Sequence, residues 1–279
     1  MIQVGTRLFA KLEMYNPTGS VKDRIVGYIA KAAIERGELL AGMQLVEATS
    51  GNTGIALAAY GAAHNHPVTI VMPGNMSEER KQMMRLYGAT ILEVSDSDFQ
   101  EAITVRNDLV SQEGWWSPCQ FENPDNVKCH ALTTGPEIYI DSPDRGARWE
   151  AFVSGAGTGG TMMGVRKFVQ SHPDLSPKFI LVVPAEGSDK HGIQGIGDGH
   201  DFLLERDLMD SVISVKTQEA IQRAKKLASD TGILVGISSG ANLVAAERWI
   251  EDNNPAGYVV TLLCDRGERY LSMYGGGVS

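Results

Sequence analysis

Strand-like and helix-like segments alternate along this 279-residue chain, and this alternation constrains the fold more than any other feature. Short runs rich in β-branched residues occur at 68–72, 90–94, 149–154, 179–183, 212–215 and 258–263. Segments with the apolar spacing of helices occur at 80–86, 99–110, 162–170, 217–229 and 241–251. Strands separated by helices of about 10–15 residues form βαβ units, in which the strands are parallel. We therefore predict an α/β protein whose mainly parallel, twisted sheets are flanked by helices.

Two series of these units fit two lobes. The polar letters FENPD at residues 121–125 interrupt the pattern and indicate the break between them. We expect a smaller lobe over residues 13–123 and a larger one over 124–279, with residues 1–12 adding a strand to the larger lobe. A chain of this length can bury large cores without disulfides, and its 43% hydrophobic and 21% charged residues are typical of a globular protein.

Charge and cysteine content narrow the function classes. Lys and Arg number 25 and Asp and Glu 34, so the net charge is −9, which disfavours nucleic acid and anionic membrane as partners. Cys119, Cys129 and Cys264 form no CxxC pair and are typical of reduced thiols. No apolar run approaches the roughly 18 residues of a membrane span, and the first residues lack the apolar core of a signal peptide. We expect a cytoplasmic protein, and no metal site, because His64 and His66 have no further ligands nearby in the sequence.

Three glycine-rich turns are the candidate ligand sites. They are SGNTG at 50–54, GAGTGGT at 155–161 and GISSGAN at 236–242. Each follows a strand-like run and begins a helix-like one, where free backbone N–H groups and the helix dipole favour an anion. One such turn would be an ordinary tight turn, but three in one chain indicate a ligand spread across a crevice.

The second turn also matches a dinucleotide-binding pattern. Gly155, Gly157 and Gly160 spell G-x-G-x-x-G after a strand, and Glu186 follows the next strand as a ribose-binding acid would. A nicotinamide-dependent oxidoreductase is therefore one alternative. It does not explain the other two turns.

A lysine favours a different cofactor. Lys22 lies in NPTGSVKDR at residues 16–24, between a turn and a helix-like segment. A lysine in such a place is usually solvated, but in a partly apolar crevice it can lose its proton and form a Schiff base. Pyridoxal phosphate is the cofactor that uses such a lysine and also needs a phosphate cradle.

Eight motifs in order carry a family resemblance over residues 8–272: NPTGSVKDR, EATSGNTGIALA, QFENPDN, TTGPEI, SGAGTGGT, GIQGIGDG, GISSGAN and CDRGERYLS. The chain resembles the cysteine synthase (O-acetylserine sulfhydrylase) family of fold-type II pyridoxal-phosphate enzymes. The resemblance implies a two-lobed fold like that of the tryptophan synthase β-subunit. Cystathionine β-synthases share most of these motifs, so the substrate is less firmly indicated than the superfamily.

The resemblance also assigns roles. Lys22 would form the Schiff base with pyridoxal phosphate and act as the base at the substrate Cα. Asn52 would hydrogen-bond the ring hydroxyl of the cofactor, and Ser238 would face its pyridine nitrogen. A neutral hydroxyl there would suit β-elimination over transamination. The cofactor phosphate would be held by Gly157, Thr158, Gly159, Gly160 and Thr161. The substrate carboxylate would be bound by Thr49, Ser50, Gly51, Thr53 and Gln120, and Gly195 would line the mouth of the pocket.

The implied reaction is a β-replacement that converts O-acetylserine and sulfide to cysteine and acetate through an α-aminoacrylate. Alternatives are a cystathionine β-synthase, an O-phosphoserine sulfhydrylase, and a catalytically weak homologue with a binding or regulatory role. The partners implied are a small amino-acid substrate, a second copy in a homodimer and serine acetyltransferase.

The start of the chain differs from the family pattern. A segment with an I-G-x-T-P-L-type motif usually precedes the first strand and helps to pack the lobes and the dimer. This chain reaches the strand-like RLFAKLE by Arg7. As an N-terminally short member, it is expected to fold and keep its cofactor-binding turns, but to turn over slowly.

Overall fold

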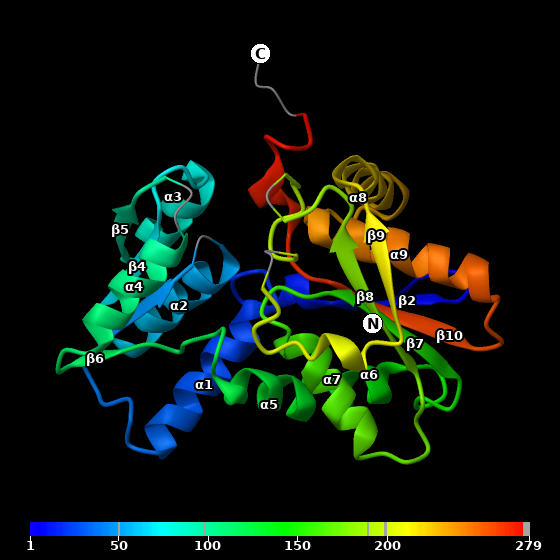
Figure 1. The fold of residues 1–279 in the computed structure, drawn as a ribbon, viewed down its shortest axis with the longest axis horizontal. Helices are drawn as coiled ribbons and strands as arrows, with labels where there is room; N and C mark the ends of the chain where they lie inside the picture. The colour runs from blue at the N-terminus through cyan, green and yellow to red at the C-terminus, as the bar shows by residue number, and fades with distance from the viewer. Residues whose placement is uncertain (50, 97–98, 189, 198–199, 276–279) are drawn as a thin grey trace. The chain divides into compact units, whose positions relative to one another are not determined.

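The computed structural model describes residues 1–49, 51–96, 99–188, 190–197 and 200–275 (Figure 1). The chain divides into two compact units. The smaller unit is Asn16–Asp125, and the larger combines Met1–Tyr15 with the chain from Asn126 onward. Within the described ranges, no helix is both long and apolar enough to cross a membrane.

The smaller unit contains a four-stranded parallel sheet in the order β5-β4-β3-β6. Its strands are β3 (Gln44–Ala48), β4 (Val68–Pro73), β5 (Thr90–Val94) and β6 (Trp115–Trp116). Its helices are α1 (Lys22–Glu35), α2 (Asn52–His64), α3 (Glu78–Leu86) and α4 (Phe99–Val110). Ala102 of α4 packs on the sheet against Val46, Ala48 and Val71. This packing places α4 directly against β3, the strand that leads into the first glycine-rich turn.

The larger unit contains a six-stranded sheet in the order β1-β2-β10-β7-β8-β9. Only the pair formed by β1 (Ile2–Gly5) and β2 (Leu8–Leu12) is antiparallel among its described pairings. The remaining strands are β7 (Trp149–Gly155), β8 (Lys178–Pro184), β9 (Ser211–Val215) and β10 (Tyr258–Leu263). Because β2 pairs with β10, the first residues of the chain extend the sheet of this unit.

Both faces of this sheet are buried. Along β7, Ala151 and Val153 join one apolar cluster and Phe152 joins the other, as the alternation of side chains in a strand requires. Figure 1 shows α8 (Thr217–Thr231) and α9 (Ile237–Asn253) over one face, and α6 (Thr134–Asp141) and α7 (Gly160–Gln170) over the other. Helix α5 (Pro124–Leu132) and short 3-10 helices at Glu13–Tyr15, Arg206–Leu208 and Gly267–Tyr270 complete the described elements.

The predicted α/β class with parallel sheets flanked by helices is confirmed, and every strand and helix named from the sequence occurs. Among the described strands and α-helices, four were not predicted: β1, β6, α5 and α6. Strands β1 and β6 span only four and two residues, too few for a periodic pattern. Helix α5 begins inside the polar stretch that had indicated a break, where Pro124 occupies its first position.

Candidate active site

The turn before α7 is shaped by glycines that have no room for a side chain. Gly159 has φ = +83°, and a Cβ built on it would lie 2.5 Å from the backbone nitrogen of Leu204. A Cβ on Gly157 would lie 2.5 Å from the carbonyl oxygen of Gly195, and one on Gly160 would overlap Oδ1 of Asn126. The backbone of this turn is therefore closely surrounded, and at Gly159 it has a conformation that only glycine adopts without strain.

Two threonine hydroxyls of the same turn are held by side chains of α5. Asn126 Nδ2 donates to Thr158 Oγ1 over 3.1 Å, and the backbone N–H of Gly160 donates to the same oxygen over 3.3 Å. Because this oxygen accepts both bonds, its own proton is left to donate to a ligand. Thr161 Oγ1 lies 3.2 Å from Nε2 of His130, a buried side chain whose Nδ1 lies 2.7 Å from Thr134 Oγ1.

These features fit a phosphate group. The turn opens the 11-residue helix α7, so backbone N–H groups and the positive end of the helix dipole lie at the turn. Glycines leave the backbone open to close approach, and Thr158 adds a hydroxyl donor. The residues predicted to bind the cofactor phosphate thus form one continuous turn suited to that role.

The sequence did not indicate the two supporting residues on α5. Asn126 is the last residue of the QFENPDN motif, but the resemblance assigns a role only to Gln120 of that motif, and the neighbouring FENPD indicates a break between lobes and not the start of a helix. His130 lies outside every motif, and only its i+4 spacing from Asn126 on a helix could have suggested a shared face.

Ser238 lies near the start of α9, in the same unit as the turn, and its side chain is buried. One turn further along α9, the buried Asn242 ties the helix to two strands. Its Nδ2 donates to the carbonyl of Leu262 over 3.1 Å, and its Oδ1 accepts the N–H of Gly155 over 2.8 Å. Asn242 therefore fixes the end of β7, where the phosphate-type turn begins, against the helix that carries Ser238. Its position in GISSGAN is the only signal the sequence offered for this role.

Lys22 is the first residue of α1 in the smaller unit. The turn before it is held by Asp23, whose carboxylate accepts the backbone N–H of Thr18 over 3.0 Å and its hydroxyl over 2.6 Å. Ser20 Oγ also accepts the backbone N–H of Lys22 over 3.2 Å. These contacts fix the backbone from which the Lys22 side chain extends.

Thr53 and Gln120 are brought together in the smaller unit, although 67 positions separate them in sequence. Thr53 Oγ1 donates to Gln120 Oε1 over 2.7 Å, and both side chains are buried. Thr49 Oγ1 accepts the N–H of Gly51 over 3.3 Å, and Asn52 begins α2. Ser50, also predicted to bind substrate, lies outside the described residues. The remaining predicted carboxylate-binding residues of this unit therefore lie in the turn that follows β3 or, for Gln120, in contact with it.

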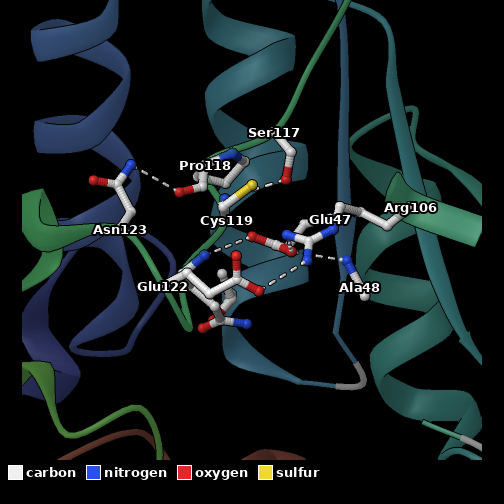
Figure 2. Close-up of polar contacts among 10 residues, drawn as sticks. Glu47, Ala48, Arg106, Ser117, Pro118, Cys119, Glu122 and Asn123 are labelled. Atoms are coloured by element: carbon white, nitrogen blue, oxygen red, sulfur yellow. Dashed lines mark hydrogen bonds and ion pairs between the residues drawn. The ribbon is translucent and has the colours of Figure 1, made fainter. Parts of the chain in front are cut away.

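A buried carboxylate that accepts the backbone N–H of Gln120 was missed from the sequence (Figure 2). Glu47 of β3 is fully buried, and Arg106 Nη1 of α4 lies 3.4 Å from its Oε1. Burial raises the pKa of Glu47, while Arg106 and the N–H groups of Gln120 and Ala48 act in the opposite direction. A charged residue inside the apolar run LVEA was the available signal, because buried charges require partners.

Two further residues, one in each unit, can be assigned more simply. Burial raises the pKa of the Cys119 thiol, which disfavours a thiolate nucleophile there. In the larger unit, Glu186 Oε1 accepts the backbone N–H of Thr217 over 2.7 Å, at the first residue of α8. The acid predicted to bind a ribose therefore caps a helix, which disfavours the dinucleotide interpretation.

Comparisons with known proteins agree with this arrangement. The sequence pattern of the family described as "Pyridoxal-phosphate dependent enzyme" matches residues 2–265. A cysteine synthase of Staphylococcus aureus is 38% identical over 273 residues, which cover 95% of this chain and 87% of the relative. The solved structure of a cysteine synthase from Entamoeba histolytica matches with a TM-score of 0.87 and 36% identity, covering 100% of this chain and 85% of that one.

A further solved structure has a different activity in its name. It is an O-acetylserine dependent cystathionine beta-synthase from Helicobacter pylori, with a TM-score of 0.87 and 34% identity over 95% of this chain and 88% of that one. These matches extend over nearly the whole length of the chain, and they confirm the resemblance inferred from the eight motifs. The chain therefore belongs to the pyridoxal-phosphate dependent enzymes, in their fold-type II class.

Proposed function

We propose that this protein converts O-acetylserine and sulfide to cysteine and acetate by pyridoxal-phosphate dependent β-replacement. The observation that carries the proposal is the closely packed glycine turn before α7, whose N–H groups and Thr158 hydroxyl suit the cofactor phosphate. The 38% identity to a cysteine synthase over 95% of the chain supports the choice of reaction. When bound, pyridoxal phosphate supplies an electron sink that lets an amino acid lose its Cα proton and its β substituent.

The chain's own residues would divide the remaining work. The Lys22 amine would hold the cofactor and take the proton from the substrate Cα. Asn52 would donate to the cofactor ring hydroxyl. Thr49, Gly51, Thr53 and Gln120 would bind the substrate carboxylate and so orient the Cα–H bond.

Residues of the larger unit would set the electronic properties of the cofactor ring and bind the cofactor phosphate. The neutral Ser238 hydroxyl would accept or donate one hydrogen bond at the ring nitrogen without placing a charge there, which favours loss of a β substituent over transamination. Residues 157–161 would bind the phosphate, and Gly195 would lie at the mouth of the site. Acetate would then leave with its bonding electrons, and sulfide would add at the same carbon before the proton returns to Cα.

A thiol amino acid is a second candidate for the nucleophile that replaces acetate. It is supported by the Helicobacter pylori structure, which is named as an O-acetylserine dependent cystathionine beta-synthase. In that case a thiol amino acid would replace sulfide, while the first half of the reaction would be the same. Assaying O-acetylserine with sulfide and, separately, with homocysteine distinguishes the two functions by product.

We further propose a cytoplasmic homodimer that acts on small amino-acid substrates and contacts serine acetyltransferase. Leu132 of α5 and Ile140 of α6 are 59% and 63% exposed, and a dimer interface over these helices would cover both side chains. Sedimentation of the holoenzyme, alone and with serine acetyltransferase, tests the association.

Replacing Lys22 tests the proposed function directly. Lys22→Ala should abolish the borohydride-reducible bond to the cofactor and lower cysteine formation by roughly 10²–10⁴-fold, the usual contribution of a positioned base. Lys31→Ala on the same helix is the matched control, because Lys31 is exposed and pairs only loosely with Glu35 over 3.9 Å. A Lys22→Ala protein that still carries a reducible bond and turns over normally would contradict the assignment.

A further inference from the structure

The stability of the fold does not by itself explain the buried pair of Glu47 and Arg106. The two side chains are 0% and 1% exposed, and they come from β3 and α4 of the smaller unit. Removing two charges from water costs several kcal/mol per ion, and a buried ion pair often stabilises a fold no more than an apolar pair would. A role other than stability therefore has to be sought in what the carboxylate contacts.

The Glu47 carboxylate accepts hydrogen bonds from two separate segments (Figure 2). Its Oε1 accepts the backbone N–H of Ala48 over 2.9 Å, at the last residue of β3. Its Oε2 accepts the backbone N–H of Gln120 over 3.0 Å. One carboxylate thus joins the end of β3 to the segment that carries Gln120, and each oxygen holds one of them.

The contact between Thr53 and Gln120 fixes the direction of the Gln120 amide. Because Oε1 accepts the Thr53 hydroxyl, the NH₂ group is the part of the side chain that can donate to a ligand. A donor of this kind suits a carboxylate. The amide direction depends on the backbone position of Gln120, which the Glu47 carboxylate sets.

The segment before Gln120 is held in an unusual conformation. Cys119 has φ = +47°, a left-handed value that a non-glycine residue rarely adopts. Its N–H donates to Ser117 Oγ over 3.2 Å, and Asn123 Nδ2 donates to the Pro118 carbonyl over 3.1 Å. Strained backbone persists where surrounding contacts define it, and it is concentrated at functional sites.

Arg106 contacts this segment at a second point. Besides Glu47, its guanidinium reaches Glu122, with Nη2 3.8 Å from Oε1 of that side chain. Arg106 therefore lies between the buried carboxylate and the residues that follow Gln120, and Figure 2 shows its guanidinium directed at both acids.

We propose that Glu47, held by Arg106, is a positioning residue that sets Gln120 against Thr53 so that the Gln120 NH₂ group can bind the α-carboxylate of the substrate. The ligand's identity rests on the proposed function, whereas the positioning itself rests only on contacts within the smaller unit. Glu47 touches neither substrate nor cofactor in this scheme.

Glu47→Gln is the principal test, because it keeps the shape of the side chain and removes its charge. In the holoenzyme we expect the KM for O-acetylserine to rise about tenfold, with kcat within about threefold and cofactor affinity within about twofold of the parent. Hydrogen–deuterium exchange should become faster in peptides covering residues 117–121. Arg106→Lys, which keeps a positive charge, should give the same pattern with a smaller rise in KM, and it serves if Glu47→Gln does not fold.

Lys81→Met is the matched control. Lys81 is equally buried in the same unit, and its Nζ pairs with Glu93 Oε1 over 2.9 Å and donates to the Gly74 carbonyl over 2.6 Å. This variant should lose thermal stability and leave both the KM and the exchange at residues 117–121 unchanged.

The outcomes separate the two proposals. An unchanged KM in Glu47→Gln, or an equal rise in Lys81→Met, would overturn the positioning role. If the parent does not use O-acetylserine, the proposed function fails, and exchange decides the positioning. Faster exchange at residues 117–121 in Glu47→Gln alone supports the positioning role, and unchanged exchange overturns it.

Discussion

The turn before α7 and the turn before α2 have the same sequence signature but are built differently. Each is rich in glycine, follows a parallel strand and begins a helix. In the larger unit, a Cβ on Gly157, Gly159 or Gly160 would meet neighbouring atoms at 2.5 Å or closer. In the smaller unit, a Cβ on Gly51 would meet only Arg80 Nη1, at 3.7 Å, whereas one on Gly54 would lie 2.7 Å from the flexible end of the Met84 side chain. The first turn is shaped in advance for a fixed group, and the second has room at Gly51 to adjust to a group that enters and leaves.

The support behind the two turns differs in the same way. Asn126 and His130 contact the hydroxyls of Thr158 and Thr161 and so hold the side chains of the first turn directly. The second turn is held at the strand before it, where Glu47 accepts the N–H of Ala48. A resident phosphate suits the first arrangement, and a substrate carboxylate suits the second.

The largest effect on this contrast is expected when alanine replaces one glycine in each turn. Gly160→Ala places a Cβ on Oδ1 of Asn126, and overpacking of this kind costs about 1–3 kcal/mol or more. We expect its affinity for pyridoxal phosphate to fall about 100-fold. Gly51→Ala, which has space, should change that affinity less than about threefold. Titration of both apoproteins with the cofactor measures the difference, and equal losses would mean that the two turns are equally constrained.

The sequence predicted the first of these turns more completely than the second. Alternating apolar runs located β7, β8 and β10, because periodicity and burial are local properties that a short window records. Glycines at fixed spacing located the turn, because only glycine fits its backbone. The family resemblance then supplied roles for residues such as Lys22 and Ser238, which their surroundings alone would not have indicated.

The supporting residues could not be predicted, because their partners are distant in the chain. His130 and Thr161 are 31 positions apart, and Glu47 and Gln120 are 73 apart. No local pattern states which helix or strand will cover a given side chain. The buried Glu47 in LVEA was visible as an anomaly, but its meaning depended on knowing that α4 and the Gln120 segment pack against β3.

A smaller effect is expected from the threonine hydroxyls of the first turn. Thr158→Ala removes one donor to the phosphate, and losing a hydrogen bond to a charged group costs about 1.5–3 kcal/mol, or roughly ten- to a hundredfold in cofactor affinity. Thr161→Ala should fall in the lower part of this range, because only Thr158 also accepts the N–H of Gly160. Cofactor titration checks both variants. Unchanged affinity in both, or tight binding of NAD by the parent, would instead favour a dinucleotide site.

The smallest effect concerns pH, and it contrasts one carboxylate from each unit. Partial burial disfavours the charge of Asp210, but the N–H of Phe179 at 2.8 Å and the Lys178 ammonium at 3.0 Å outweigh it, so its pKa lies below the ordinary 3.8. Asp210 therefore stabilises the fold above pH 3.8, and this stability is lost as the pH falls through its lower folded pKa. Complete burial raises the pKa of Glu47 above 4.5. The contribution of Glu47 to the free energy of unfolding therefore changes in the opposite direction, and it decreases as the pH rises past 4.5.

Melting temperatures of Asp210→Asn and Glu47→Gln, each relative to the parent, test these signs between pH 3 and pH 7. Asp210 is about one-third exposed, so solvent screening limits its contribution to under about 1 kcal/mol, or a few degrees. The deficit of Asp210→Asn should be constant above about pH 4 and shrink below it, because both proteins are then neutral at this position. The deficit of Glu47→Gln should instead shrink as the pH rises from about 4.5, because only the parent must then carry a buried charge. Parallel pH profiles for the two variants would show that burial does not distinguish the two carboxylates, and the contrast between the units would then be confined to their glycine turns.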